Sequence, residues 1–138
     1  MPAHRSPLVP MLLALLTLGG VAQTLPARAA TPGELLSSYA TQAGRDAQAA
    51  RGQQLFTTRH GREWSCSSCH GERPVAAGRH ASTARPIDPL APAAHRARFT
   101  DAAKTEKWFR RNCNDVLARE CTAAEKADVL AWLITLTP

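Results

Sequence analysis

Methionine is nearly absent from this 138-residue chain, and aromatic side chains are few. The two methionines are Met1 and Met11, and aromatic residues make up 5% of the sequence. A metal site anywhere beyond these first residues therefore has no thioether ligand from methionine. After the beginning of the chain, no stretch approaches the roughly 20 apolar residues that a membrane-spanning helix needs. We therefore expect no stable membrane anchor.

Dense basic runs are also missing. The chain carries 17 Lys and Arg against 11 Asp and Glu, which gives a formal net charge of +6. Nucleic-acid binding is not expected, because no cluster of Lys and Arg is interleaved with aromatic residues. A mild excess of positive charge suits the steering of an acidic redox partner instead.

The beginning of the chain has the pattern of an export signal. Arg5 precedes an apolar run from Leu8 through Val21, and Ala27-Arg28-Ala29 forms an A-x-A cleavage signature. We expect residues 1–29 to be a signal peptide and residues 30–138 to be one domain in the periplasm. A retained anchor is the alternative, although the run is short for a membrane span. Cleavage lowers the net charge to near +4, since two arginines are removed.

The central motif of the chain is Cys66-Ser67-Ser68-Cys69-His70, which reads C-x-x-C-H. This is the pattern at which haem is attached covalently to a protein. Cys66 and Cys69 would form thioethers with two vinyl groups on one haem edge, and His70 would bind the iron from the proximal side. A redox dithiol would need no histidine and would lie near a βαβ pattern, which the chain lacks. The motif predicts a c-type cytochrome with one haem c.

Two further cysteines, Cys113 and Cys121, lie outside the motif. In an oxidising compartment, a leftover pair eight positions apart most simply forms a disulfide. All four thiolates together could instead hold a zinc ion. That alternative leaves His70 and the export signal unexplained.

Helix signals dominate the rest of the chain, and no segment alternates like a strand. Helices are expected from Thr31 to Gly44, from about residue 46 to 56, from Thr100 to about Cys113, and from Thr122 onward. The first of these helices is expected to cross the last. Gly52, inside the second helix, indicates a close helix crossing, although a simply tolerated glycine is the alternative. The pattern predicts an all-α fold of about four helices around one covalently bound haem.

Residues on both sides of the motif are candidates for the haem pocket. Trp64 directly precedes the motif and is expected to pack against the edge of the macrocycle. Segment 71–92 is long and irregular, and we expect it to wrap the haem with Ile87 and Leu90 in contact. Trp108 lies one helical turn before Asn112 on the same face. It either lines the distal pocket or belongs to the ordinary core.

The distal iron ligand is not settled by residue chemistry alone. With methionine excluded, the candidates are a histidine, a lysine, or a weaker donor such as asparagine, and an open position is also possible. His60 closely precedes the motif and is expected on the proximal side. Imidazole suits iron well, so His80 ranks first and His95 second on these grounds. Asn112 and Asn114 rank lower.

Several segments of the second half, taken with the haem motif, resemble one known family. They are Pro89-Leu90-Ala91-Pro92, Arg98-Phe99-Thr100-Asp101, Glu106-Lys107-Trp108, Asn112-Cys113-Asn114-Asp115-Val116-Leu117, Cys121-Thr122 and Glu125-Lys126-Ala127-Asp128. With these residues, essentially the whole mature chain resembles the SHP-type cytochromes c, which are related to cytochrome c″. The resemblance implies a small class I cytochrome c-like fold.

The same resemblance implies a distal ligand and a partner. In the family, the residue immediately before the first late cysteine binds the iron, and it is asparagine in SHP-type members and histidine in c″-type members. Asn112 holds that position here, which places it ahead of His80. Cys113 and Cys121 match the family disulfide. The family context also implies a dihaem or multihaem cytochrome c as the electron donor.

An asparagine ligand would have a functional consequence. The amide oxygen is a hard donor, better matched to ferric than to ferrous iron. We expect Asn112 to bind weakly in the oxidised protein and to leave on reduction, which opens the iron to O2 or NO. The alternatives are a low-spin electron carrier with His80 as second axial ligand, or a haem enzyme such as a peroxidase. No acid–base constellation in the sequence favours the enzyme.

Overall fold

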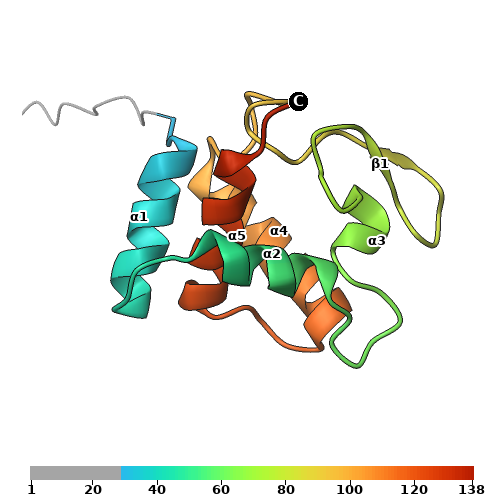
Figure 1. Ribbon diagram of the computed structural model, residues 1–138, viewed down its shortest axis with the longest axis horizontal. Helices are drawn as coiled ribbons and strands as arrows, with labels where there is room; N and C mark the ends of the chain where they lie inside the picture. The colour runs from blue at the N-terminus through green and yellow to red at the C-terminus, as the bar shows by residue number, and fades with distance from the viewer. Residues whose placement is uncertain (1–28) are drawn as a thin grey trace, which may run out of the picture.

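The computed structural model describes residues 29–138, which form five helices and one short β-hairpin (Figure 1). The predicted signal peptide lies outside the described residues except for Ala29. The elements in chain order are α1 (Pro32–Ala43), α2 (Ala49–Thr57), α3 (Ser67–His70), β1 (Gly78–Arg79), β2 (Pro86–Ile87), α4 (Ala102–Leu117) and α5 (Ala123–Thr135). Within this part of the chain, no helix is long and apolar enough to cross a membrane.

Helices α1 and α5 begin at the capping boxes that the sequence predicts. The Thr31 hydroxyl accepts from the Glu34 amide at 3.1 Å, and the Glu34 carboxylate accepts from the Thr31 amide at 2.7 Å. Thr122 and Glu125 repeat the arrangement at the start of α5. Gly44 ends α1 in the left-handed conformation, with φ of 64°. These local signals locate helix ends well because the orphan backbone groups there need partners.

Helix α4 differs from its predicted bounds at both ends. Asp101 rather than Thr100 is the N-cap, because its carboxylate accepts the backbone N–H three residues on at 2.9 Å. At the other end, the helix continues past Cys113 to Leu117 and closes at Ala118, whose φ is 57°. The predicted end near Cys113 was therefore wrong. Helix α2 also begins later than predicted, at Ala49 rather than near residue 46.

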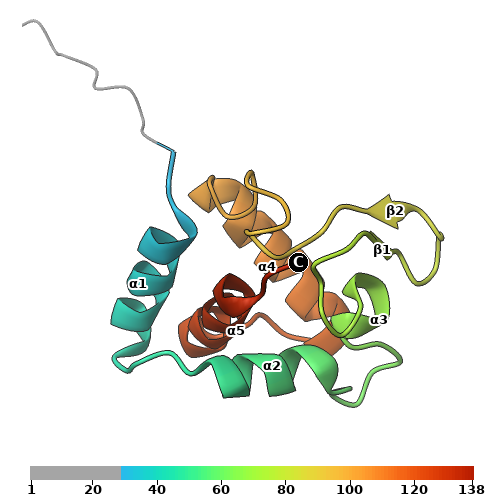
Figure 2. The same ribbon diagram turned by 45° about the horizontal axis from the view of Figure 1, so that its top comes forward.

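Helix α5 lies at the centre of the fold and packs against both α1 and α2 (Figure 2). The crossing with α2 is close at Gly52, as the sequence predicts. A Cβ atom at this glycine would collide with the main chain of Asp128 and with the nitrogen of Val129. Only a residue without a side chain allows the two backbones to approach so closely.

The hydrophobic core forms two clusters against α5. The first includes the Phe56 and Trp132 rings, whose centroids are 5.0 Å apart. The second includes Leu35, Tyr39 and Leu130. Phe99 and Phe109 pack against both clusters, which joins them into one core.

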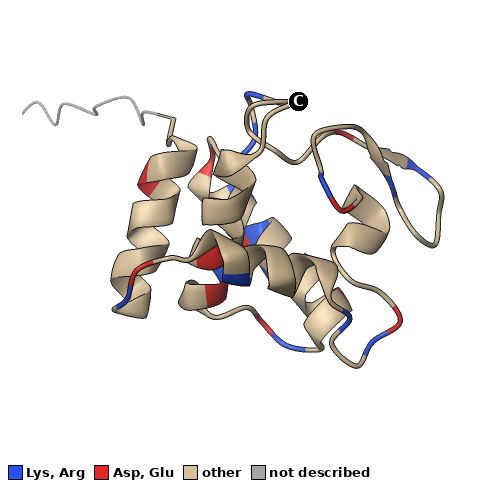
Figure 3. Cartoon of the chain, in the orientation of Figure 1, with Lys and Arg blue, Asp and Glu red and all other residues tan. Residues whose placement is uncertain are grey.

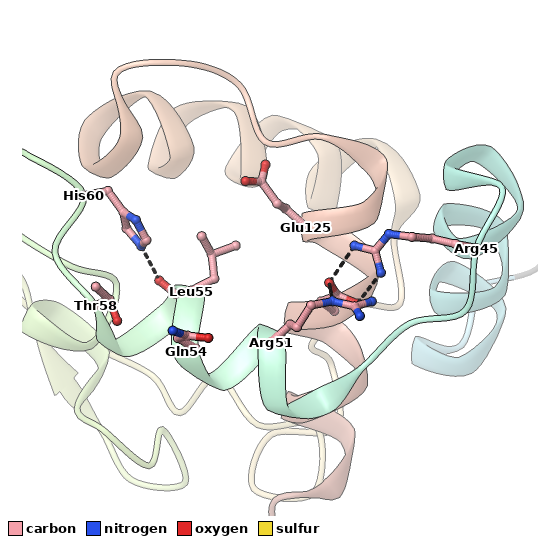
Figure 4. Close-up of a pocket in the computed structure, with 8 residues that line it drawn as sticks. Arg45, Arg51, Gln54, Leu55, Thr58, His60 and Glu125 are labelled. Atoms are coloured by element: carbon pink, nitrogen blue, oxygen red, sulfur yellow. Dashed lines mark hydrogen bonds and ion pairs between the residues drawn. The ribbon is translucent and has the colours of Figure 1, made fainter.

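A buried carboxylate fastens the start of α2 to α5. Asp128 is 3% exposed and accepts hydrogen bonds from the Gln48 amide at 2.6 Å and from the guanidinium groups of Arg45 and Arg51 at 2.8 and 2.9 Å. Figure 4 shows these arginines on one side of a cavity of about 290 Å³. These three donors compensate for the burial of the Asp128 charge, which would otherwise destabilise the fold.

Candidate functional site

The predicted attachment residues lie together at α3. Cys66 is the N-cap of this short helix, and the amides of Cys69 and His70 donate to its carbonyl at 3.3 and 3.1 Å. The two thiols are therefore one turn apart, and the imidazole follows at the end of the turn. All three side chains are half-buried. This is the arrangement that attachment to one edge of a haem requires.

Burial sets the protonation of these groups. It raises the pKa of the Cys66 thiol to about 11 and lowers the pKa of His70 to about 4. A smaller cause at His70 is the positive charge of Arg98. At neutral pH, His70 is a neutral imidazole, the form that binds a metal ion.

Serine hydroxyls hold the turn of the motif in place. The buried Ser65 hydroxyl is 2.8 Å from that of Ser67 and 3.1 Å from that of Ser68. The Ser65 amide also donates to the Ser68 hydroxyl at 3.0 Å. On the other side, the ring centroid of His70 lies 6.0 Å from that of Phe56, which links the motif to the core.

The β1–β2 hairpin packs directly on the motif. A Cβ atom at Gly78 would collide with the Cys69 carbonyl, and the Ala81 amide donates to the Cys69 sulfur at 3.3 Å. Neither Gly78 nor Ala81 was among the predicted site residues. Gly78 in a polar loop was the available signal, because glycine often marks a close approach of two backbones.

The long segment after the motif folds back over the core, and its predicted wrapping of the haem stays a prediction. Leu90 packs against the same core cluster as Cys66, and its amide donates to the Pro74 carbonyl at 3.0 Å. Arg98 donates to the Pro89 carbonyl at 2.8 Å. Ile87 is half-buried in β2. Arg98 was part of the family resemblance, but its position beside His70 was not predicted.

Helix α4 carries the predicted distal residues. Asn112 is half-buried, and Trp108 is 43% exposed with the Arg111 guanidinium 5.6 Å from its ring centroid. An exposure of this size excludes the interpretation of Trp108 as an ordinary core residue. The C-terminal half of α4 lies on the α3 side of the molecule in both ribbon views (Figures 1 and 2).

A cavity lies between the segment just before the motif and this part of α4. It has a volume of about 250 Å³ and is lined by Arg62, Glu63, Trp64 and Asp115. Trp64 is two residues before Cys66, and Asp115 is one turn after Asn112 along α4. The structure therefore brings the segment that enters the motif together with the predicted distal end of the helix.

The three histidines outside the motif lie in separate surroundings. The Nε2 of His60 pairs with the Leu55 carbonyl at 2.9 Å, beside the cavity that Arg45 and Arg51 line (Figure 4). His80 lies in the hairpin turn, where its Nδ1 accepts the Thr83 amide at 3.3 Å. The Nε2 of His95 is 3.8 Å from a carboxylate oxygen of Asp88.

The late cysteines pair with each other. Cys113 and Cys121 are at disulfide distance, with their Cα atoms 5.6 Å apart. The pair ties α4 to the start of α5. Four-thiolate zinc binding is therefore wrong, and the described residues contain no group of three or more His, Cys, Asp or Glu that could hold a metal ion.

Comparison with known proteins identifies the family. A family model described as a domain of unknown function, DUF1924, matches residues 42–133. A cytochrome c-type protein SHP from Cereibacter sphaeroides is 48% identical over 107 residues, which span 75% of this chain and 82% of that protein. This chain belongs to the SHP and cytochrome c″ family. Cytochrome c″ from Methylophilus methylotrophus is 43% identical over 82 residues, covering 59% of this chain and 57% of its relative.

Solved structures agree with the SHP and cytochrome c″ assignment. Oxidised SHP, described as an oxygen-binding cytochrome c, has a TM-score of 0.72 at 46% identity and covers 76% of this chain and 96% of its own. Oxidised cytochrome c″ from M. methylotrophus has a TM-score of 0.70 at 33% identity, with coverage of 78% and 95%. A solution structure of cytochrome c″, described for its insights into haem-ligand detachment, also scores 0.70, at 31% identity and with coverage of 78% and 94%.

Membership in this SHP and cytochrome c″ family confirms the predicted all-α fold class, to which the structure adds the short β1–β2 hairpin, and the haem c cofactor. The residues at α3 fit that cofactor, because they present two thiols one turn apart and a neutral imidazole beside them. The extra helix beyond the predicted four is α3 itself, which is only four residues long.

Proposed function

We propose that this cytochrome accepts electrons in the periplasm and uses Asn112 as a weak distal ligand that leaves on reduction. Cys66 and Cys69 hold the haem through thioethers, and His70 is the proximal ligand. The bound haem supplies an iron that cycles between ferric and ferrous states. Departure of Asn112 frees the distal face for a small ligand such as O2 or NO.

The observation that carries this proposal is the state of the Asn112 side chain. It is half-buried on α4, one turn before the residue that lines the cavity beside Trp64, and it makes no hydrogen bond with any described residue. Asn114, two positions on, is exposed and donates to the Arg110 carbonyl at 2.8 Å. Solvent reaches the amide atoms of Asn112, since they are not among the buried polar atoms without a partner, so they are open to a ligand. An unpaired amide at Asn112 suits a residue whose partner is an iron ion.

Ligand chemistry supports the redox step. A neutral amide oxygen is a hard donor, so Asn112 binds ferric iron more strongly than ferrous iron. The relatives are consistent with this behaviour, because SHP is described as oxygen-binding and cytochrome c″ as a case of haem-ligand detachment. The small ligand of this chain is therefore a diatomic molecule such as O2 or NO.

The neighbours of Asn112 limit how it moves. The Cys113–Cys121 disulfide anchors the adjacent backbone to the start of α5, which limits how far Asn112 swings away from the iron. The disulfide also acts as a staple for a small domain. Trp108 lines the distal pocket and limits the entry of water and larger ligands, while Trp64 packs against the edge of the macrocycle. Ile87 and Leu90 contact the haem from the wrapping segment.

Two alanine variants test the identity of the ligand. Asn112→Ala is expected to change the ferric optical and electron paramagnetic resonance spectra while leaving the ferrous optical spectrum as it is in the wild type, because Asn112 is bound only in the ferric state. His80→Ala is the matched control and is expected to leave both spectra unchanged.

The opposite pattern would favour the alternative function, an electron carrier with His80 as the second axial ligand. If His80→Ala changes the spectra, Asn112→Ala does not, and both states are low-spin, the protein is a bis-histidine carrier and the Asn112 proposal fails. The electron donor in either case is expected to be a dihaem or multihaem cytochrome c.

A further inference from the structure

The β1–β2 hairpin region has charge of one sign only. Between Glu72 and Asp88 the chain carries three arginines and no acidic residue. These are Arg73, Arg79 and Arg85, and all three are exposed. Figure 3 shows basic segments along the hairpin and no acidic segment in its turn.

Elsewhere, four basic side chains form ion pairs with carboxylates. Arg119 lies 2.6 Å from a carboxylate oxygen of Glu125, and Lys126 is 2.7 Å from one of Glu106. Arg45 and Arg51 share the buried Asp128 carboxylate, as described above. The arginines of the hairpin have no carboxylate partner among the described residues. Their positive charge is therefore available to a partner molecule.

The turn of the hairpin is held in one shape by its own hydrogen bonds. The His80 amide donates to the Arg85 carbonyl at 2.8 Å, and the Ala84 amide donates to the His80 carbonyl at 2.9 Å. The Arg79 guanidinium donates to the Ala84 carbonyl at 2.9 Å. A turn ordered in this way loses little conformational entropy on binding.

Small side chains at the tip allow a close approach. Residues 81–84 are Ala, Ser, Thr and Ala, and all are exposed. The backbone amide of Ala81 lies 3.3 Å from the Cys69 sulfur. A protein seated on this tip would be separated from a haem-attachment sulfur by about one layer of small residues. Electron tunnelling falls steeply with distance, so such a position favours rapid transfer.

We propose that the hairpin from Gly78 to Ile87 is the docking surface for an acidic redox protein that reduces the haem past Cys69. Arg79 and Arg85 steer the partner, and the small residues of the tip set the distance. One electron passes from the reduced partner to the ferric haem, so the partner is oxidised by one electron. The proposal rests on the proposed acceptance of electrons and does not depend on Asn112.

Charge-matched variants of the full holoprotein test this surface. Arg79→Glu/Arg85→Glu reverses two charges on the hairpin, and Lys104→Glu/Lys107→Glu reverses two exposed charges on α4. Both variants change the net charge equally. Arg79→Lys/Arg85→Lys keeps the charge while changing the guanidinium hydrogen bond. The probe is flavodoxin, a strongly acidic one-electron donor in its fully reduced form.

The first readout is the second-order rate of haem reduction by reduced flavodoxin in stopped flow. At low ionic strength, we expect the hairpin reversal to lower the rate by about tenfold or more and to abolish most of its salt dependence. The α4 reversal should change the rate by about twofold or less, and the Lys variant should stay close to the wild type. Equal losses in both reversals, or no loss in either, would overturn the proposal.

The second readout does not involve electron transfer. Oxidised flavodoxin is added to the ferric wild type, and amide chemical shifts are followed by NMR. We expect salt-sensitive shifts concentrated in residues 78–87, and shifts confined to another face would contradict the proposal. Because no electron passes, this readout reports docking even where the proposed electron acceptance or the Asn112 switch fails.

Discussion

The double variant Cys66→Ala/Cys69→Ala is expected to carry no covalently bound haem, whereas the wild type carries one per chain. The reason is that each thioether forms when a thiol S–H adds across a vinyl group, and alanine offers no sulfur. The measurement is the mass of the denatured protein after expression in a host that attaches haem c. Each single variant should keep the haem through its remaining sulfur, with a weaker yield.

The late cysteines supply the control for this experiment. Cys113→Ala/Cys121→Ala should retain the mass of one haem, because in the wild type these two sulfurs pair with each other and not with the cofactor. Covalent haem on the Cys66/Cys69 variant, or its loss from the Cys113/Cys121 variant, would show that the attachment site is misassigned. The same spectra test the predicted cleavage, since the mature chain should begin at Ala30.

The second large effect concerns the crossing of α2 and α5. Gly52→Ala is expected to lower the free energy of unfolding by about 3 kcal/mol or more, at the high end for a single substitution. The added methyl group meets the carbonyl group of Asp128 and the nitrogen of Val129, which are backbone atoms and cannot rotate away. The two helices must separate to admit it, which opens the core around Phe56.

The same substitution at Gly33 is the matched control. Gly33 also lies in a helix, but a Cβ atom there meets nothing within 4 Å. Gly33→Ala should therefore be neutral or stabilising by up to about 1 kcal/mol, because alanine favours the helix. Denaturant unfolding of the two variants and the wild type measures both values. Similar stabilities for the two variants would refute the close crossing.

Local signals in the sequence predicted much of the helical fold. The capping boxes at Thr31 and Thr122 and the glycine after α1 are set by residues within one turn of each other, so one sequence suffices to find them. The ends of α4 were harder. Thr100 and Asp101 are both good N-caps, and nothing local marks Ala118 as a stop, because its left-handed conformation is uncommon for alanine.

Long-range features were beyond the reach of sequence patterns. Asp128 bonds with Arg45 from 83 positions away, and no local rule pairs them. The hairpin was predicted only as an irregular loop, because its strands are two residues long and its position depends on contact with Cys69. Interactions of this kind are set by the tertiary structure and have no periodic signature.

The candidate site was predicted unevenly. The haem motif was evident because its chemistry imposes a fixed local spacing on Cys66, Cys69 and His70. Asn112 emerged only through the family resemblance, since asparagine is an uncommon iron ligand and residue chemistry alone favoured His80. The half-buried and unpaired amide of Asn112 is structural support that the sequence could not provide.

The most direct test of the central claim is the optical spectrum of the wild-type holoprotein as it is reduced without oxygen, followed by titration with NO. The account predicts a five-coordinate, high-spin ferrous spectrum that changes at once on addition of NO, because Asn112 has left the iron. A six-coordinate, low-spin ferrous spectrum that resists NO would contradict it, since the distal ligand would then remain bound after reduction.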